Sequence, residues 1–236
     1  MSYNCDRNSG KLIAFEGVEG CGKTTQIRRV YQWLQSGEIP LEYPVVFTRQ
    51  PGGTNLGLEL RQILLNTDRG INKHAELFLY AADRAEHVAT FIKPQLAAGA
   101  IVLCDRYTDS TVAYQGYAHG LSLEVISYIN QIATDGLESH LTLWLDVDVE
   151  VGLARTRRRG SSDRMELANL DFHRRVQQGY VELALAHPQR IVRIDASLNE
   201  DQVFQQIQRI LIQKFEEWGM NLTWGMGKNN YNVRSF

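Results

Sequence analysis

The chain has 236 residues, of which 44% are hydrophobic and 22% are charged, and its formal net charge is -2. This length and composition fit one α/β domain with a sizeable core and exclude a disordered chain. The near-neutral charge argues against a broad surface for duplex nucleic acid, so anionic ligands would need a local basic cluster.

The sequence also lacks the features of a membrane or secreted protein. It contains no run of about 18 apolar residues, and its first residues, MSYNCDRNSGK, lack the apolar core of a secretory signal. Three cysteines, Cys5, Cys21 and Cys104, are too few and too scattered for a disulfide framework or a zinc site. We therefore expect a cytoplasmic location.

Short apolar runs alternate with segments of helical periodicity along the chain. The expected strands cover residues 11–16, 44–48, 100–105, 140–146 and 190–195. The expected helices cover residues 24–36, 56–66, 73–98, 122–134, 148–158, 168–187 and 199–217. This alternation predicts βαβ units and an open five-stranded parallel sheet with helices on both faces. We interpret 1–217 as a single domain and 218–236 as a C-terminal tail, either loose or docked through its tryptophans.

A glycine-rich segment, FEGVEGCGKTT, follows the first expected strand and opens the first expected helix. Gly17 to Thr24 fits the phosphate-loop pattern G-x-x-x-x-G-K-[ST] in the strand and helix context that this pattern requires. Its glycines turn the backbone so that N–H groups face phosphate oxygens, and the helix N-terminus favours an anion. The expected ATP-binding residues are Gly17, Val18, Glu19, Gly20, Cys21, Gly22, Lys23, Thr24 and Thr25.

This motif predicts a nucleoside triphosphate ligand but not the reaction, because GTPases, motor ATPases and small-molecule kinases share it. Lys23 would reach the β- and γ-phosphates, and Thr24 would offer its hydroxyl to Mg²⁺. The only candidate for a guanine-binding N-K-x-D motif, residues 72–75, lacks the acid, which argues against a GTPase.

Four further clusters follow in the chain: TRQPGGT at 48–54, YAADR at 80–84, DRYTDSTVAYQG at 105–116 and RTRRRGSSDRME at 155–166. Together with the phosphate loop, they resemble the thymidylate kinase family in order and spacing, over about residues 11–195. The resemblance implies the P-loop nucleoside monophosphate kinase fold and transfer of a phosphoryl group from ATP to dTMP with Mg²⁺. It also implies a homodimer, for which the helix at 73–98 is a possible contact surface.

The residues at the strand ends agree with this chemistry. Arg49 and Arg106 each follow an expected strand, at the carboxyl edge where open α/β sheets bind ligands. Two arginines from neighbouring strand ends can hold one monophosphate, although each could instead pair with a carboxylate. Asp105 ends its strand beside the phosphate loop, where a carboxylate can reach Mg²⁺ or orient Arg106.

The resemblance also implies a pocket for the acceptor nucleotide. Tyr80, where the family usually has Phe, would stack on thymine, and Arg84 would hydrogen-bond the edge of the base. Thr111 and Gln115 would complete the base pocket, and Tyr114 would crowd out a 2′-hydroxyl. Glu19 would accept a hydrogen bond from the 3′-hydroxyl of the sugar.

A clear departure from the family pattern occurs after Arg49. The family commonly reads Arg-Glu-Pro-Gly-Gly, and this chain has Gln50 in place of the acid. One negative charge is lost, which puts in doubt any role of that acid in binding metal or holding an arginine.

The basic segment at about 152–166 is interpreted as a lid. It carries Arg155, Arg157, Arg158, Arg159 and Arg164 around a glycine. A run of charge is often only a solvated surface, but arginines suit the clamping of a phosphoryl group in transfer. Because the phosphate loop has no Arg, the family's bacterial pattern implies catalytic arginines in the lid. The expected catalytic residues are Lys23, Arg106, Arg157 and Arg159.

Two alternatives to this function remain open from the sequence. One is a kinase for another nucleoside or nucleoside monophosphate, and the other is a non-enzymatic nucleotide sensor. A separate question concerns Cys21, which is either a small filler in the loop or, beside Lys23 at a helix N-terminus, an accessible and reactive thiol.

Overall fold

The computed structural model describes residues 10–39, 41–65, 70–158, 164–165 and 167–220. Its centre is a five-stranded sheet in which all neighbouring strands are parallel, in the order β2-β3-β1-β4-β5. The strands are β1 (Lys11–Glu16), β2 (Val45–Arg49), β3 (Ile101–Asp105), β4 (Leu141–Asp146) and β5 (Ile191–Asp195). The predicted open parallel sheet is therefore confirmed.

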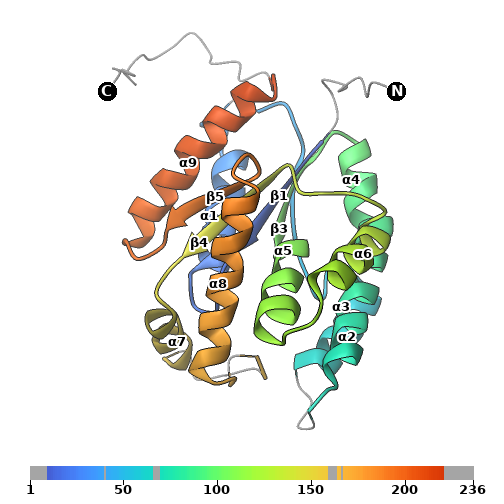
Figure 1. Cartoon of the computed structure of the whole chain (residues 1–236). Coiled ribbons are helices and arrows are strands. Elements are labelled where there is room, and N and C mark those ends of the chain that lie inside the picture. The colour runs from blue at the N-terminus through green and yellow to red at the C-terminus, as the bar shows by residue number, and fades with distance from the viewer. Residues whose placement is uncertain (1–9, 40, 66–69, 159–163, 166, 221–236) are drawn as a thin grey trace.

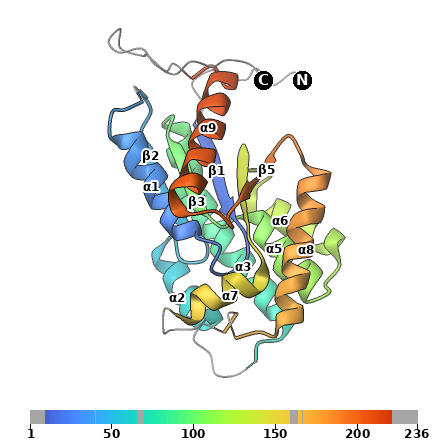
Figure 2. The same ribbon diagram turned by 90° about the vertical axis from the view of Figure 1, so that its left-hand side faces the viewer.

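Helices cover both faces of this sheet, as predicted (Figures 1 and 2). On one face lie α1 (Lys23–Gln35) and α9 (Glu200–Glu217), which contact each other. The other face carries α5 (Thr108–Thr111), η2 (Val112–Ala118) and α8 (Leu170–Ala186), with η1 (Val88–Ile92) and α4 (Lys93–Ala97) beside β3. Around these lie α2 (Asn55–Leu65), α3 (Lys73–His87), α6 (Leu123–Thr134) and α7 (Val149–Arg157).

The core follows from the alternation of side chains along the strands. In β1, Leu12 packs in the cluster with Val88 of η1, whereas Ile13 belongs to the cluster that includes Ile27 of α1 and Ile207 of α9. Every residue of β1 is buried, as expected for a central strand covered on both faces. The central strand thus anchors the loop that follows it.

Two helical segments differ from the sequence-based prediction. The helix expected at 73–98 consists of α3, the π-helical turn η1 and α4 in succession. The segment 108–118, for which no helix was predicted, forms α5 and the π-helix η2. η2 packs closely on α8, where a Cβ on Gly179 would lie 2.9 Å from the Cα of Ala113. This close packing makes a helix of a segment that is poor in strong helix formers.

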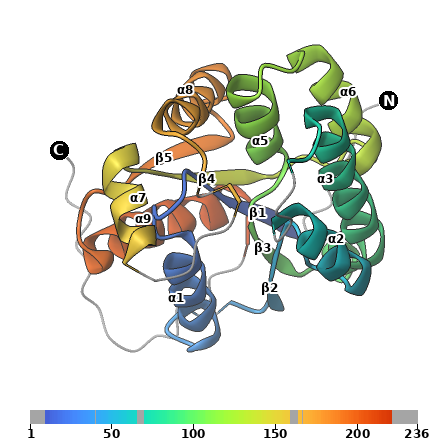
Figure 3. The ribbon, with the colours of Figure 1, turned by 90° about the horizontal axis from the view of Figure 1, so that it is seen from below.

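The strand register sets the position of the functional site. Arg49 of β2 pairs with Asp105 of β3, which pairs with Phe15 of β1. The carboxyl ends of three neighbouring strands therefore meet at one level, and α2 and α7 lie at this edge of the sheet (Figures 1 and 3). Ligands of open α/β folds bind at this edge.

The residues after α9 cover the opposite edge of the sheet. The Nζ atom of Lys11 lies 5.8 Å from the centroid of the Trp218 ring, which also contacts the rings of His140 and Phe215. Met220 is buried, and its N–H donates to the carbonyl of Phe215. The first residues of the proposed tail thus pack on the domain, and residues 221–236 lie outside the described part. No helix among the described residues has the length and apolar character to span a bilayer.

Candidate active site

A cavity of about 1040 Å³ opens at the carboxyl edge of the sheet. One end is lined by the phosphate loop and the start of α1, together with Arg155 and residues that follow β5. The other end, called here the acceptor end, is lined by residues of β2, α3, α5 and η2 and by the loops beside them. Most of the predicted site residues line this cavity: Glu19, Gly20, Cys21, Gly22, Lys23, Thr24, Thr25, Arg49, Tyr80, Arg84, Asp105, Arg106, Thr111, Tyr114 and Gln115.

The phosphate loop has the backbone that its glycines predict. Gly22 caps the N-terminus of α1 with a φ of 97°, a conformation that favours glycine. Gly20, with a φ of 69°, lies so close to α7 that an added Cβ would be 2.0 Å from the carbonyl oxygen of Gly152. Gly17 and Val18 are buried beneath the loop and do not line the cavity. The motif thus forms a tight loop whose glycines occupy positions where a side chain would be strained or would clash.

Lys23 is held inside this loop. Its Nζ donates to the carbonyl oxygens of Gly17 at 2.9 Å and Val18 at 3.0 Å, and contacts the Sγ of Cys21 at 3.4 Å. The ammonium is therefore positioned at the floor of the cavity by backbone acceptors. A phosphate oxygen that enters the loop meets a cation in a fixed place.

The two predicted metal-binding residues lie in contact. The hydroxyl of Thr24 donates to Asp105 Oδ2 at 3.3 Å. A hydroxyl and a carboxylate oxygen beside a phosphate site are the ligand types that Mg²⁺ prefers. The residues therefore fit a magnesium ion shared with bound phosphates.

Arg106 lies between the two ends of the cavity, in a turn with a φ of 68°. Its guanidinium donates to the Gly17 carbonyl at 3.1 Å, to Ser110 Oγ at 3.1 Å and to the Tyr114 hydroxyl at 3.0 Å. It also forms an ion pair with Glu19 of the phosphate loop. Arg106 therefore connects the phosphate loop to the acceptor end of the cavity.

The ion pair between Arg106 and Glu19 shifts the pKa of both groups. Burial would raise the pKa of Glu19, but the charges of Arg106 and Lys23 outweigh burial and hold this pKa below its usual value. Burial would likewise lower the pKa of Arg106, and the charge of Glu19 outweighs it and raises that pKa. Both groups are therefore charged at neutral pH.

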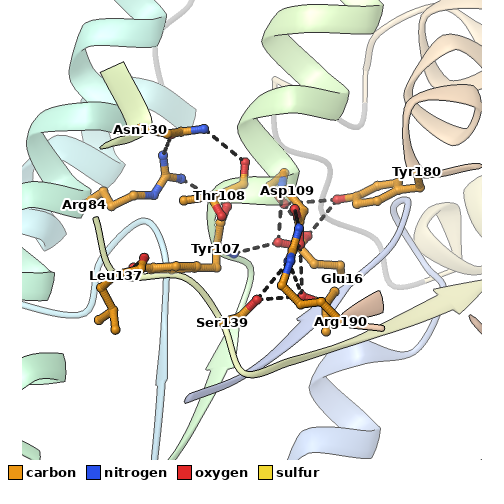
Figure 4. Close-up of polar contacts among 12 residues, drawn as sticks. Glu16, Arg84, Tyr107, Thr108, Asp109, Asn130, Leu137, Ser139, Tyr180 and Arg190 are labelled. Carbon is orange, nitrogen blue, oxygen red and sulfur yellow. Dashed lines mark hydrogen bonds and ion pairs between the residues drawn. The ribbon is translucent and has the colours of Figure 1, made fainter. Parts of the chain in front are cut away.

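A buried carboxylate, that of Glu16, holds the residues that follow Arg106; Figure 4 shows it beside Tyr107 and Tyr180. Glu16 accepts from the backbone N–H of Tyr107 at 2.7 Å, from Ser110 Oγ at 2.6 Å and from the Tyr180 hydroxyl at 2.8 Å. Burial and the nearby charge of Asp109 raise the pKa of Glu16. Because Ser110 also accepts from Arg106, Glu16 positions that arginine through one intermediate side chain.

The acceptor end is built from α3, α5 and η2. Tyr80 and Arg84, one helical turn apart on α3, both line the cavity with Thr111 and Gln115. Arg84 is only 2% exposed, and its three hydrogen bonds go to Gln50 Oε1, Asn130 Oδ1 and the Tyr107 carbonyl. Figure 4 shows the contacts with Asn130 and Tyr107. The predicted acceptor residues are thus brought together around one pocket.

Comparison with known proteins agrees with this geometry. The family model described as thymidylate kinase matches residues 15–207. The chain belongs to the thymidylate kinase family. A thymidylate kinase from Trichodesmium erythraeum (strain IMS101) is 57% identical over 221 residues, which cover 89% of this chain and 98% of the relative. One from Nostoc punctiforme is 58% identical over 205 residues, covering 86% and 95% respectively.

A solved structure confirms the fold of this thymidylate kinase family member. The crystal structure of thymidylate kinase from Ehrlichia chaffeensis matches with a TM-score of 0.69 and 32% sequence identity. The match covers 86% of this chain and 99% of the other. The predicted P-loop nucleoside monophosphate kinase fold is therefore confirmed.

The arginines of the basic segment that was predicted to form a lid occupy different environments in this thymidylate kinase family member. Arg155 lines the cavity and donates to the carbonyl of Ala196 at 3.3 Å. Arg157 and Arg158 are exposed at the end of α7, and neither lines the cavity. Arg159 lies outside the described residues. Arg157 therefore lies outside the cavity in this structure, and its catalytic role stays a prediction.

Arg164, at the far end of the basic segment, is held by α2 and α3. It forms an ion pair with Glu76, which is 1% exposed, and its Nε donates to the carbonyl of Leu64 at 3.0 Å. Glu76 also accepts from Gln115 Nε2 at 2.7 Å and lies 3.2 Å from His119 Nε2. One buried carboxylate thus positions both Gln115, which lines the cavity, and Arg164 of the basic segment.

The structure supports the simpler of the two roles considered for Cys21. The expectation of an accessible thiol is wrong, because Cys21 is 2% exposed and packs in the main core. Its sulfur contacts the ammonium of Lys23. Cys21 therefore fills the space under the loop, and Cys104, at 0% exposure, is also buried.

Several cavity residues were missed by the sequence analysis. The segment after β5 contributes Ala196, Leu198, Asn199 and Glu200 at the phosphate-loop end. Its position at the carboxyl edge could have been inferred from the expected strand alone. Gln50 also lines the cavity but was noted only as a departure from the family pattern, and Glu76, which contacts Gln115 of the cavity lining, carried no signal, because the partners of both lie far away in the sequence.

Proposed function

We propose that this chain transfers the terminal phosphoryl group of ATP to dTMP and forms dTDP. Membership in the thymidylate kinase family supports the reaction. The observation that carries the proposal is the place of Arg106, which contacts the phosphate loop through Gly17 and Glu19 and the acceptor end through Ser110 and Tyr114. A guanidinium at this junction can neutralise charge on both nucleotides at the point of transfer.

The two ends of the cavity divide between the two nucleotides. ATP would lie with its phosphates in the loop and its nucleoside beside Arg155 and the residues after β5. The acceptor would place its phosphate between Arg49 and Arg106 and its base against Tyr80 and Arg84. Thr111, Gln115 and Tyr114 would close the base and sugar pocket. This arrangement sets the two nucleotides end to end, as direct transfer requires.

Thr24 and Asp105 would hold Mg²⁺, directly or through water. The ion would neutralise phosphate charge during the transfer. Lys23 would neutralise oxygens of the transferred group, and Arg157 and Arg159 of the lid would add charge in the closed state. The monophosphate of the acceptor is itself the nucleophile, so no covalent intermediate with the protein is needed.

Glu19 has a second role in this proposal. In the structure its carboxylate is paired with Arg106. When the acceptor phosphate binds Arg106, the carboxylate is free to accept from the 3′-hydroxyl of the sugar. This exchange of partners by Glu19 would couple correct placement of the sugar to release of Arg106 from the ion pair.

We further propose a homodimer that forms through α2, α3 and α6, which lie next to one another. These three helices expose the large apolar side chains of Leu58, Ile63, Phe78, Tyr128 and Ile132. Large exposed apolar side chains on neighbouring helices are typical of a subunit interface. Phe78→Glu should therefore give monomers in sedimentation experiments, whereas Leu185→Glu, at an exposed position on α8, should leave the oligomeric state unchanged. The cytoplasmic location remains a prediction.

The direct test is a coupled assay of ADP release over a panel of nucleosides and nucleoside monophosphates. We expect turnover that depends on both dTMP and Mg²⁺. Higher activity with a nucleoside, or with another monophosphate, would identify the related kinase that the sequence left open. If the chain binds ATP but releases no ADP with any of the acceptors, it is a nucleotide sensor.

A further inference from the structure

Gln50, where the family pattern has an acid, lies in a buried hydrogen-bond network behind the base pocket. Its side chain is 4% exposed and contacts two residues of α3. Arg84 Nε donates to Gln50 Oε1 at 2.9 Å, and Gln50 Nε2 lies 3.1 Å from His87 Nδ1. The amide therefore bridges an arginine at the base pocket and a buried histidine.

The hydrogen-bond directions in this network follow from the arginine. A guanidinium N–H can only donate, so the Gln50 atom that faces it must be the amide oxygen. The amide nitrogen then donates to His87, whose Nδ1 must carry a lone pair. The other ring nitrogen of His87 carries the proton and donates to Thr48 Oγ1, which lies at 2.7 Å.

The electrostatics of this buried site agree with a neutral histidine. Burial and the charge of Arg84 lower the pKa of His87 to about 4. His87 is therefore uncharged at neutral pH and can accept the hydrogen bond from the Gln50 amide. A carboxylate at position 50 could not donate this bond.

The same network does not neutralise the positive charge of Arg84. The three oxygens that accept from Arg84, on Gln50, Asn130 and Tyr107, are all neutral. A guanidinium carries further N–H groups, and Arg84 lines the cavity. Neutral partners fix the orientation of the arginine without forming an ion pair with it, so its positive charge can attract a carbonyl oxygen of the ligand.

We infer that Gln50 is a positioning residue that aims Arg84 at the acceptor base, with neutral His87 fixing the orientation of the Gln50 amide. This inference rests on the proposed role of Arg84 in the base pocket. It assigns to the glutamine a part in recognition of the acceptor rather than in metal binding.

A double-mutant cycle tests this inference. Gln50→Met should raise the KM for dTMP by about 10-fold, since a hydrogen bond to a charged group is lost. The KM for ATP should change by less than about 2-fold. In Arg84→Met, the further change Gln50→Met should have little additional effect on the KM for dTMP, because Gln50 acts through Arg84.

The outcomes separate this inference from the proposed function. If Arg84→Met raises the KM for dTMP and Gln50→Met does not, or if the two effects multiply, the positioning role of Gln50 is overturned and the base pocket stands. If neither variant changes this KM, Arg84 does not bind the base. Thr142→Val removes a buried hydroxyl that contacts Asp109 and Ser139 away from the cavity, and should leave the KM for dTMP unchanged even where stability falls.

A second measurement does not depend on activity or on the folding of the methionine variants. Long-range ¹H–¹⁵N spectra of the wild-type protein should show His87 with Nδ1 unprotonated and Nε2 protonated. Gln50→Glu removes the donor and places a carboxylate beside Nδ1, so that nitrogen should become protonated. A wild-type spectrum with a proton on Nδ1 would overturn the assignment of the amide.

Discussion

The two ends of the cavity are built in different ways. At the phosphate-loop end, Lys23 is held by carbonyls of Gly17 and Val18, only six and five residues away in the sequence. At the acceptor end, Arg84 is held by Gln50 and Asn130, which lie 34 and 46 residues away. A local motif therefore determines the first end, whereas the second depends on the packing of several helices.

The largest expected effect is at the locally built end. Lys23→Ala should lower kcat by on the order of 10³-fold, because a principal charge stabiliser of the transferred group is lost. The cooperative melt should persist, since the lost hydrogen bonds lie within one loop. Steady-state assays and circular dichroism would measure both. Lys93→Ala, which removes a lysine paired with exposed Asp135, is the control and should keep full activity.

Arg157 tests whether the predicted lid acts together with the phosphate-loop end of the cavity. Arg157→Ala should lower kcat by roughly 10²-fold and raise the KM for dTMP far less, because its contact forms mainly in the transition state. Arg158→Ala removes an equally exposed charge next to it and should have a much smaller effect. If only KM rises in the Arg157 variant, the residue binds substrate and Arg159 is the next candidate.

The acceptor end depends on contacts between residues that are distant in the sequence. We therefore expect the stability of the protein to fall in acid, where one of these contacts is lost. Burial would raise the pKa of Glu76, but hydrogen bonds from His119, Arg164 and Gln115 outweigh burial and lower it to about 2. Because the folded pKa is depressed, the stabilisation is present above the unfolded value of about 4.5 and is lost as the pH falls towards 2.

We therefore expect roughly 2–3 kcal/mol of the free energy of unfolding to be lost over this range. Urea unfolding at several pH values would measure it. Glu76→Gln should make the protein less stable at neutral pH and flatten the acid dependence. Glu150→Gln, at an exposed ion pair with Arg174, should leave the curve as it is. An unchanged acid dependence in Glu76→Gln would show that another carboxylate is responsible.

The smallest effect concerns selectivity among acceptors. Loss of the 5-methyl group costs about 1–3 kcal/mol, so dUMP should be a poorer substrate by roughly 10–200-fold in kcat/KM. The ribose counterpart of dTMP should be rejected more strongly, because its 2′-hydroxyl would meet the ring of Tyr114. Tyr114→Phe keeps the ring and should keep this rejection. Equal rates with the two sugars would remove Tyr114 from this role.

The same contrast explains what the sequence could predict. The alternating apolar runs predicted the five strands, and the phosphate loop was visible because its residues are contiguous. The helix at 108–118 was missed because its β-branched residues and Gly116 favour other structures, and its packing on α8 overrides that preference. Gln50 was visible only as a departure from a pattern, since its partners become neighbours only in the folded chain.

The contact between Lys11 and Trp218 has a practical consequence. It brings the start of β1 and the end of α9 together at the edge of the sheet that faces away from the cavity. The two ends of the domain are thus neighbours in space, the arrangement that circular permutation requires. It also makes this edge the natural place to attach a fluorophore, a surface linker or a fused protein, because the attached group would stay remote from the nucleotide site.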